Sequence, residues 1–241
     1  MDRVAGALPA RALLVNSTMT RAAQARIERG VPHVRRHVRI LTLGTEERER
    51  SPARVSGRPL RVGMVCRFQA WKGIDLFLEA AVFARKAGAD LVVTLWGGPT
   101  DAPDSRAYAE GLPARAEAAG VHLAGPVRDF RELRGCIDVI VNASLTPEPF
   151  GLTLIEGMSI GAVPVAPREG GPCEIIEEDR TGLFFAPRDA RALGEVLTAL
   201  AADPGYVARL SGDAWESART RFSAGRMVRE LETLYTELLS R

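Results

Sequence analysis

The sequence LRVGMVC, residues 60–66, begins a strict alternation of short apolar runs and segments with helical spacing. Each apolar run has about five residues and is rich in β-branched side chains, which is typical of a strand buried on both faces. Because crossover helices cover both faces of such a sheet, the sequence predicts an α/β fold, a doubly wound parallel Rossmann-like sheet. We expect strands at 60–66, 90–96, 121–125, 138–143, 162–166 and 182–186, and helices at 74–87, 105–119, 130–136, 151–160, 172–178 and 190–202, with two more helices at the end of the chain.

The net charge differs in sign between the first 59 residues and the rest of the chain. Residues 1–59 hold twelve Arg, no Lys and five acids, a net charge of +7, whereas residues 60–241 have a net charge of −5. Residues 44–59 contain almost no apolar side chains, and their charges, Pro and Gly predict a linker rather than a buried element. We therefore expect a short strand–helix–strand appendage at 1–43, with strands at 12–15 and 38–43 and a helix at 20–29, then the linker at 44–59 and the main domain at 60–241.

Composition narrows the class of protein. No stretch approaches the roughly 18 uninterrupted apolar residues of a membrane span, and Arg11 interrupts the one short apolar run near the start, so we expect a cytoplasmic protein without a transmembrane segment. Three cysteines without a CxxC pair predict reduced, mostly buried thiols and no zinc site. The arginine-rich start lacks aromatic interleaving, so we expect no nucleic-acid partner.

The loop after the first strand of the main domain holds two cations. It reads Arg67-Phe-Gln-Ala-Trp-Lys72-Gly73, in a chain with thirty Arg and only two Lys. A lysine is a compact point charge that binds phosphate well, and ligands bind beyond the carboxyl ends of parallel strands. The loop therefore indicates a phosphate site, with a solvated basic loop as the alternative.

The loop after the fourth strand is a second candidate. Prolines flank Glu148, and Gly151 precedes a helix whose free N–H groups and positive dipole end face the same crevice, a natural anion site. Glu156 comes about one and a half turns into that helix, where its two oxygens suit paired sugar hydroxyls. An ordinary loop acid and an exposed helix acid are the alternatives for these two residues. The Gly-Gly-Pro sequence at 170–172 follows the fifth strand. Such a loop can follow a ligand closely, but Gly-Gly-Pro is also a common turn, so alone it is weak evidence for a binding site.

These motifs resemble a known family. The run EPFGLTLIE at 148–156, EGMSIGAVPV at 156–165 and GGPCEIIEEDRTGL at 170–183 resemble the donor-binding half of GT-B glycosyltransferases, in particular retaining family 4. The sequences VCR at 65–67 and WKG at 71–73 resemble the Arg and Lys pair of the same family. The resemblance covers about residues 60 to 240, in the same order throughout.

The resemblance implies a metal-independent site for a nucleotide-sugar donor, UDP- or GDP-linked, with no other cofactor. Arg67 and Lys72 would hold the diphosphate, Glu156 the ribose hydroxyls and Glu148 the transferred sugar, while the loop 125–128 would border the base. Catalytic roles fall to Glu148, Arg67 and Lys72. The expected donor contacts, including those of backbone amides, are Arg67, Lys72, Val127, Glu148, Phe150, Gly151, Leu152, Thr153 and Glu156.

The chain departs from the family at its start, where residues 1–43 resemble only a remnant of the N-terminal acceptor domain. We therefore expect a donor-binding subunit with an unknown acceptor, inactive or weak as the isolated chain. A non-catalytic nucleotide-sugar-binding module is the alternative. The apolar stripe of the last helix also needs cover, so we expect self-association or a separate acceptor-domain polypeptide. The stripe consists of Met227, Leu231, Leu234 and Leu238.

Overall fold

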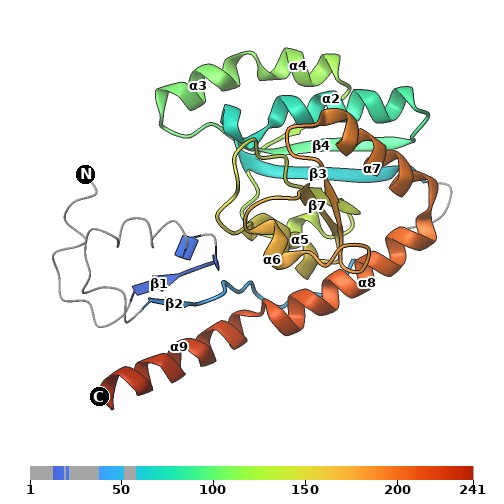
Figure 1. Cartoon of the computed structure of the whole chain (residues 1–241). Coiled ribbons are helices and arrows are strands. Elements are labelled where there is room, and N and C mark those ends of the chain that lie inside the picture. The colour runs from blue at the N-terminus through green and yellow to red at the C-terminus, as the bar shows by residue number, and fades with distance from the viewer. Residues whose placement is uncertain (1–12, 19, 22–37, 52–57, 241) are drawn as a thin grey trace.

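The computed structural model describes residues 13–18, 20–21, 38–51 and 58–240 (Figure 1). Near the start, β1 (Leu13–Val15) and β2 (Val38–Ile40) pair in parallel as a separate two-stranded sheet. Both strands lie where the sequence predicts them. Most of the helix expected at 20–29 lies outside the described residues.

The main domain contains a six-stranded, wholly parallel sheet in the order β5-β4-β3-β6-β7-β8. This confirms the doubly wound α/β fold, and each strand begins and ends within two residues of its expected bounds. The chain builds outward from β3 to β5 and then crosses back to β6, on the other side of β3. The carboxyl ends of β3 and β6 therefore flank the point where the strand order reverses, which is where doubly wound sheets bind ligands. The strands are β3 (Leu60–Arg67), β4 (Leu91–Gly98), β5 (His122–Ala124), β6 (Val139–Val141), β7 (Val163–Pro167) and β8 (Leu183–Phe185).

Helices cover both faces of this sheet. On one face α2 (Ile74–Lys86) packs against α7 (Ala190–Ala202), and on the other α5 (Leu152–Ser159) packs against α8 (Pro204–Arg221) (Figure 1). Strand β6 shows why its sequence is apolar throughout. Val139 and Val141 belong to the core under α2 and α7, whereas Ile140 between them belongs to the core under α5 and α8.

The single helix expected at 105–119 is two helices in the structure, α3 (Pro103–Glu110) and α4 (Leu112–Ala118). Pro113 explains the break, because it has no N–H to donate and its ring clashes with the preceding turn of a continuous helix. Proline is instead tolerated in the first turn of α4, after the N-cap Gly111. The segments expected at 130–136 and 172–178 form the shorter η3 (Phe130–Leu133) and α6 (Pro172–Ile175).

The last helix, α9 (Ala224–Leu239), extends away from the sheet and runs beside β1 and β2 (Figure 1). None of its residues is fully buried, and the predicted apolar stripe is only half-buried. Between β2 and α9 lies a hollow of about 260 Å³ lined in part by Leu14, Ile40 and Leu234.

The described part of the predicted linker is fastened to the domain rather than free. The Thr45 N–H donates to the Phe222 carbonyl at 2.7 Å, and the Ser51 N–H donates to the Ile160 carbonyl at 2.8 Å. Thr45 itself is buried despite the polar composition of the segment. The division of the chain at residues 43 and 59 stays a prediction.

The composition predicts the absence of a membrane span and the burial of the cysteine thiols. None of the described helices is long and apolar enough to cross a membrane, and the cytoplasmic location stays a prediction. The expectation of mostly buried thiols is wrong for two of the three: Cys66 is half-buried, but Cys136 and Cys173 are exposed. Cys136 lies in a turn and Cys173 in the first turn of the short α6, both at the surface, and the spacing of cysteines along the sequence carries no information on this.

Candidate functional site

A cavity of about 270 Å³ opens at the carboxyl ends of β3 and β6. The loops that follow these strands touch there, since the Leu145 N–H donates to the Trp71 carbonyl at 2.8 Å. Gly73 makes this approach possible: its φ is +71°, and a Cβ at this position would lie 1.9 Å from the Ala143 carbonyl oxygen. The lining residues are Met64, Val65, Cys66, Arg67, Lys72, Val141, Asn142, Ser144, Glu148, Gly151, Leu152 and Thr153.

Lys72 and Glu148 form an ion pair inside this cavity. The distance from Lys72 Nζ to Glu148 Oε2 is 2.7 Å, and the two side chains are 15% and 16% exposed. The same carboxylate oxygen accepts a hydrogen bond from Ser144 Oγ at 3.0 Å, so two donors fix the Glu148 side chain. Lys72 Nζ also lies 4.0 Å from the centre of the Trp71 ring, a favourable cation–π contact. The Lys72 ammonium group has three N–H donors, and Glu148 accepts one of them.

The amino-terminal turn of α5 forms another wall. Gly151 is the N-cap, and Leu152 and Thr153 line the cavity with the first turn, whose N–H groups have no partners within the helix. The Gly-Gly-Pro loop supports this wall from behind. The Gly171 N–H donates to the Glu148 carbonyl at 2.8 Å, and a Cβ on Gly171 would lie 2.3 Å from Phe150 Cα.

The structure brings six of the nine expected donor contacts together. They are Arg67, Lys72, Glu148, Gly151, Leu152 and Thr153.

The other three expected contacts lie outside the cavity lining. The Phe150 side chain is buried against Phe222 in an edge-to-face contact with ring centres 6.3 Å apart, so the side chain serves the core. Val127 packs against the core under α5 and α8. Glu156 is half-buried on α5, close enough to Arg48 and Asp129 to feel their charges.

Burial sets the ionisation of two groups near the site. Burial raises the pKa of Glu156, the Arg48 guanidinium opposes that rise, and the negative charge of Asp129 adds to it. Burial also raises the pKa of the Cys66 thiol to about 12, so this cysteine is a neutral part of the cavity wall at physiological pH.

Sequence reasoning missed Asn142 and Ser144, which line the cavity and are both buried. Asn142 Oδ1 accepts a hydrogen bond from the Ser144 N–H at 2.9 Å, which fixes the turn that leaves β6. Their signal is present in the sequence, because they are the first polar residues after a wholly apolar strand. The proline-flanked Glu148, four residues after Ser144, is the more conspicuous polar feature of the same loop.

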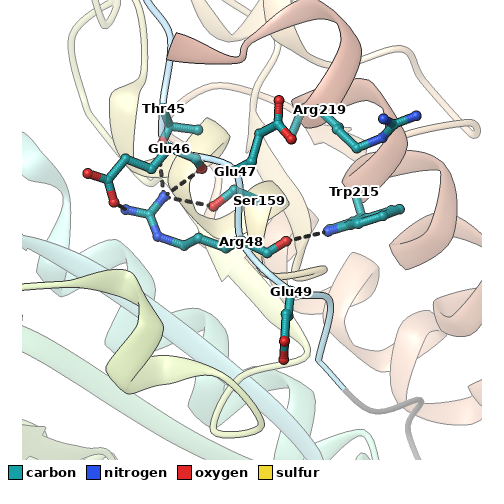
Figure 2. A pocket seen from close by; sticks show the side chains of 9 residues that line it. Thr45, Glu46, Glu47, Arg48, Glu49, Ser159, Trp215 and Arg219 are labelled. Atoms are coloured by element: carbon teal, nitrogen blue, oxygen red, sulfur yellow. Dashed lines mark hydrogen bonds and ion pairs between the residues drawn. The ribbon is translucent and has the colours of Figure 1, made fainter. Parts of the chain in front are cut away.

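A slightly larger hollow, about 300 Å³, lies between residues 45–49, the end of α5 and α8 (Figure 2). It contains none of the expected donor contacts. We assign the functional site to the smaller cavity because that one lies at the reversal of strand order and holds the paired Lys72 and Glu148. Among the residues that the structure describes, no three His, Cys, Asp or Glu side chains gather in a way that could hold a metal ion.

The fold, with a parallel Rossmann-like sheet and a site at its switch point, is that of one half of a GT-B glycosyltransferase. Residues 59–203 match the family described as Glycosyl transferases group 1. The chain belongs to this family.

Two curated relatives show how much of a longer protein the chain spans. Glycogen synthase from Thioalkalivibrio sulfidiphilus is 34% identical over 200 residues, which are 77% of this chain and 39% of that protein. D-inositol 3-phosphate glycosyltransferase from Corynebacterium urealyticum is 28% identical over 208 residues, 82% of this chain and 48% of that protein. The chain therefore spans less than half the length of either relative.

Solved structures agree on the fold. HepE from Anabaena, solved in complex with UDP and glucose, superposes with a TM-score of 0.79 at 20% identity, covering 94% of this chain and 63% of that one. The C-terminal domain of the group 1 glycosyl transferase LpcC from Francisella tularensis superposes with a TM-score of 0.63 at 23% identity. That match covers 75% of this chain and all of that domain.

Proposed function

We propose that the cavity between β3 and β6 binds the diphosphate and sugar of a UDP- or GDP-linked donor, and that the chain is the donor-binding part of a retaining, metal-independent glycosyltransferase of family 4. One observation carries the proposal. Two cations, a carboxylate and the amino-terminal turn of a helix converge on a single cavity at the switch point of the sheet.

In this proposal Arg67 and Lys72 hold the diphosphate together with the backbone N–H groups of Leu152 and Thr153. The helix end adds roughly half a positive charge. Glu148 offsets one cation, so the site is less positive than the two basic residues suggest. Two of the three ammonium donors of Lys72 are still open to phosphate oxygens.

The two acids have separate roles in this proposal. Glu148 Oε2 is held by Lys72 and Ser144, which would leave the other oxygen to accept a hydroxyl of the transferred sugar beside the amides of Phe150 and Gly151. Glu156 would accept the ribose hydroxyls, with the loop that contains Val127 bordering the base. HepE, a fold neighbour, was solved with UDP and glucose, which supports a donor of this chemical class.

The activity of the whole protein is also a proposal, because transfer needs an acceptor region and the chain matches only part of its relatives. We propose that the half-buried stripe of α9 and the strands β1 and β2 take part in that region, either in a second polypeptide or in another copy of this chain. Binding of the donor without any transfer would instead favour a nucleotide-sugar-binding module.

Calorimetric titration with UDP, GDP, ADP and their glucose and mannose derivatives tests the donor site. We expect one base to bind best and EDTA to leave its affinity unchanged, because protein groups supply the positive charge. Loss of binding on chelation and recovery with magnesium would contradict metal independence. Failure of every nucleotide to bind would contradict the proposed function itself.

A further inference from the structure

Arg48 is a buried cation that reaches the domain from the chain segment before β3. Its side chain is only 8% exposed, which is rare for an arginine unless it has fixed partners. Its Nη1 donates to Thr45 Oγ1 at 2.6 Å and to Ser159 Oγ at 3.0 Å (Figure 2). Figure 2 shows the guanidinium turned toward these oxygens, while the Arg48 carbonyl accepts from Trp215 Nε1 at 3.0 Å. Both ends of the residue are therefore fixed.

These contacts connect Arg48 with the helix turn that carries Glu156. Ser159 Oγ donates to the Glu156 carbonyl at 2.6 Å, so Arg48 and the last turn of α5 share one hydrogen-bonded chain. On its other side, Arg48 Nε lies 3.5 Å from Asp129 Oδ1, and Asp129 is the N-cap of η3. The guanidinium thus joins α5 to the loop that follows β5.

The charges around Glu156 come from these same elements. Burial is the strongest influence on the pKa of Glu156 and raises it, the Arg48 charge opposes that rise, and the Asp129 charge adds to it. Asp129 is itself paired with the exposed Arg131 at 2.5 Å. Arg48 also pairs with Glu46, whose Oε2 lies 3.9 Å from Arg48 Nη2, so its charge acts on Glu46 and Asp129 as well as on Glu156.

We propose that Arg48 is a positioning residue for Glu156, because its hydrogen bond to Ser159 and its ion pair with Asp129 hold the helix turn that aims this carboxylate. The inference rests on the proposed function for the claim that Glu156 accepts hydrogen bonds from the ribose hydroxyls. Its consequence is that residues 44–51, which lead into the domain, control the charge and placement of a donor-binding acid. A shift of this segment would then alter nucleotide affinity without touching the diphosphate cavity.

The test compares Arg48→Met with Arg50→Met in the full chain. Arg50 is the matched control, because it is on the same segment and donates to the Ala208 carbonyl at 3.0 Å and Ser211 Oγ at 3.3 Å, both on α8. The Glu156 carboxyl is titrated by carbon NMR in glutamate-labelled protein, with Glu156→Gln identifying its signal. We expect a higher titration midpoint in Arg48→Met, a wild-type midpoint in Arg50→Met and a return toward wild type in Arg48→Lys.

Affinity for UDP supplies a second measurement. In Arg48→Met it should fall several-fold at mildly acidic pH and recover toward wild type at alkaline pH, because the ionised acid is regained as pH rises. A wild-type Glu156 midpoint in folded Arg48→Met would overturn the inference, and so would a midpoint in Arg48→Lys as high as that in Arg48→Met. So would equal, pH-independent losses of UDP affinity in the Arg48 and Arg50 variants. If Glu156→Gln binds UDP as well as wild type, the proposed ribose contact fails, while the NMR titration still decides the effect of Arg48.

Discussion

Removing the charge of Glu148 should strengthen binding of a bare nucleoside diphosphate. In the structure Glu148 takes one donor of Lys72 and places a negative charge inside the proposed phosphate site. In Glu148→Gln, the shape of the side chain is kept while this charge is lost. The sugar nucleotide should gain less than the bare diphosphate, because the variant also loses the carboxylate that we propose accepts a sugar hydroxyl.

The size of the effect follows from the ion-pair geometry. Two acceptors on one ammonium group lie roughly 4.5 Å apart when each is at hydrogen-bond distance. Two unit charges at that separation repel by about 3.7 kcal/mol at an effective dielectric constant of 20. Water and counter-ions in an open cavity reduce this to about 1 to 2 kcal/mol, which is roughly a 5- to 30-fold gain in affinity for the bare diphosphate.

Calorimetry with UDP and UDP-glucose, or with whichever base binds best, measures both affinities. Glu169→Gln is a suitable control, because Glu169 is 17% exposed and paired with Arg188 at 2.9 Å but does not line the cavity. The ratio of the two affinities should move toward the bare diphosphate in Glu148→Gln and stay unchanged in the control. Weaker binding of both ligands by the same factor would refute the reasoning, since Glu148 would then act only through the fold.

Three further substitutions test other parts of the site. Lys72→Ala should weaken diphosphate binding by about 1.5 to 3 kcal/mol with little change in melting temperature, whereas Lys86→Ala, which removes the only other lysine from an exposed position, should change neither. Gly73→Ala should lower the melting temperature by roughly 5 °C or more, because the new Cβ would overlap the Ala143 carbonyl. Gly88→Ala is the control: Gly88 has a φ of +90° but open space around it, so this variant measures the strain of the backbone angle alone. Glu156→Gln should weaken nucleotide binding yet raise the melting temperature near pH 7.5. Burial raises the pKa of Glu156 in the folded protein, so its ionised carboxylate destabilises the fold above that pKa and has no effect at low pH, where the group is protonated in both states. The increase in melting temperature of Glu156→Gln should therefore vanish near pH 4.

The order of strands and helices could be predicted because the strands are short, mainly apolar runs and the helices between them show helical spacing of their apolar residues. The break between α3 and α4 was predictable as well, since Pro113 stands inside the expected helix. The burial of Arg48 was not, because nothing local marks one arginine of a charged segment as the one that packs beneath α5.

Part of the candidate site could likewise be predicted from the sequence, and part could not. Loop position along parallel strands brings Arg67, Lys72 and Glu148 to one edge of the sheet, so their convergence follows from the fold alone. That Lys72 pairs with Glu148 depends on how closely two loops approach, and this distance is set by Gly73 and Ala143 across the gap. Sequence spacing carries no information on such a contact between residues 76 positions apart.

Helix α5 explains why the site can be precise although its parts are far apart in sequence. Its first turn lines the proposed diphosphate cavity, and Glu156 follows one turn later on the same short helix, about 6 Å further along the axis. A rigid helix fixes the separation between an anion site at its start and an acid in its second turn, as a donor with a diphosphate and a ribose would require. The helix is held at its start by Gly171 against Phe150 and at its end by Arg48 through Ser159. Loosening either end would move the acid relative to the phosphate site, so substitutions at these distant supports should lower nucleotide affinity even when every residue that lines the cavity is intact.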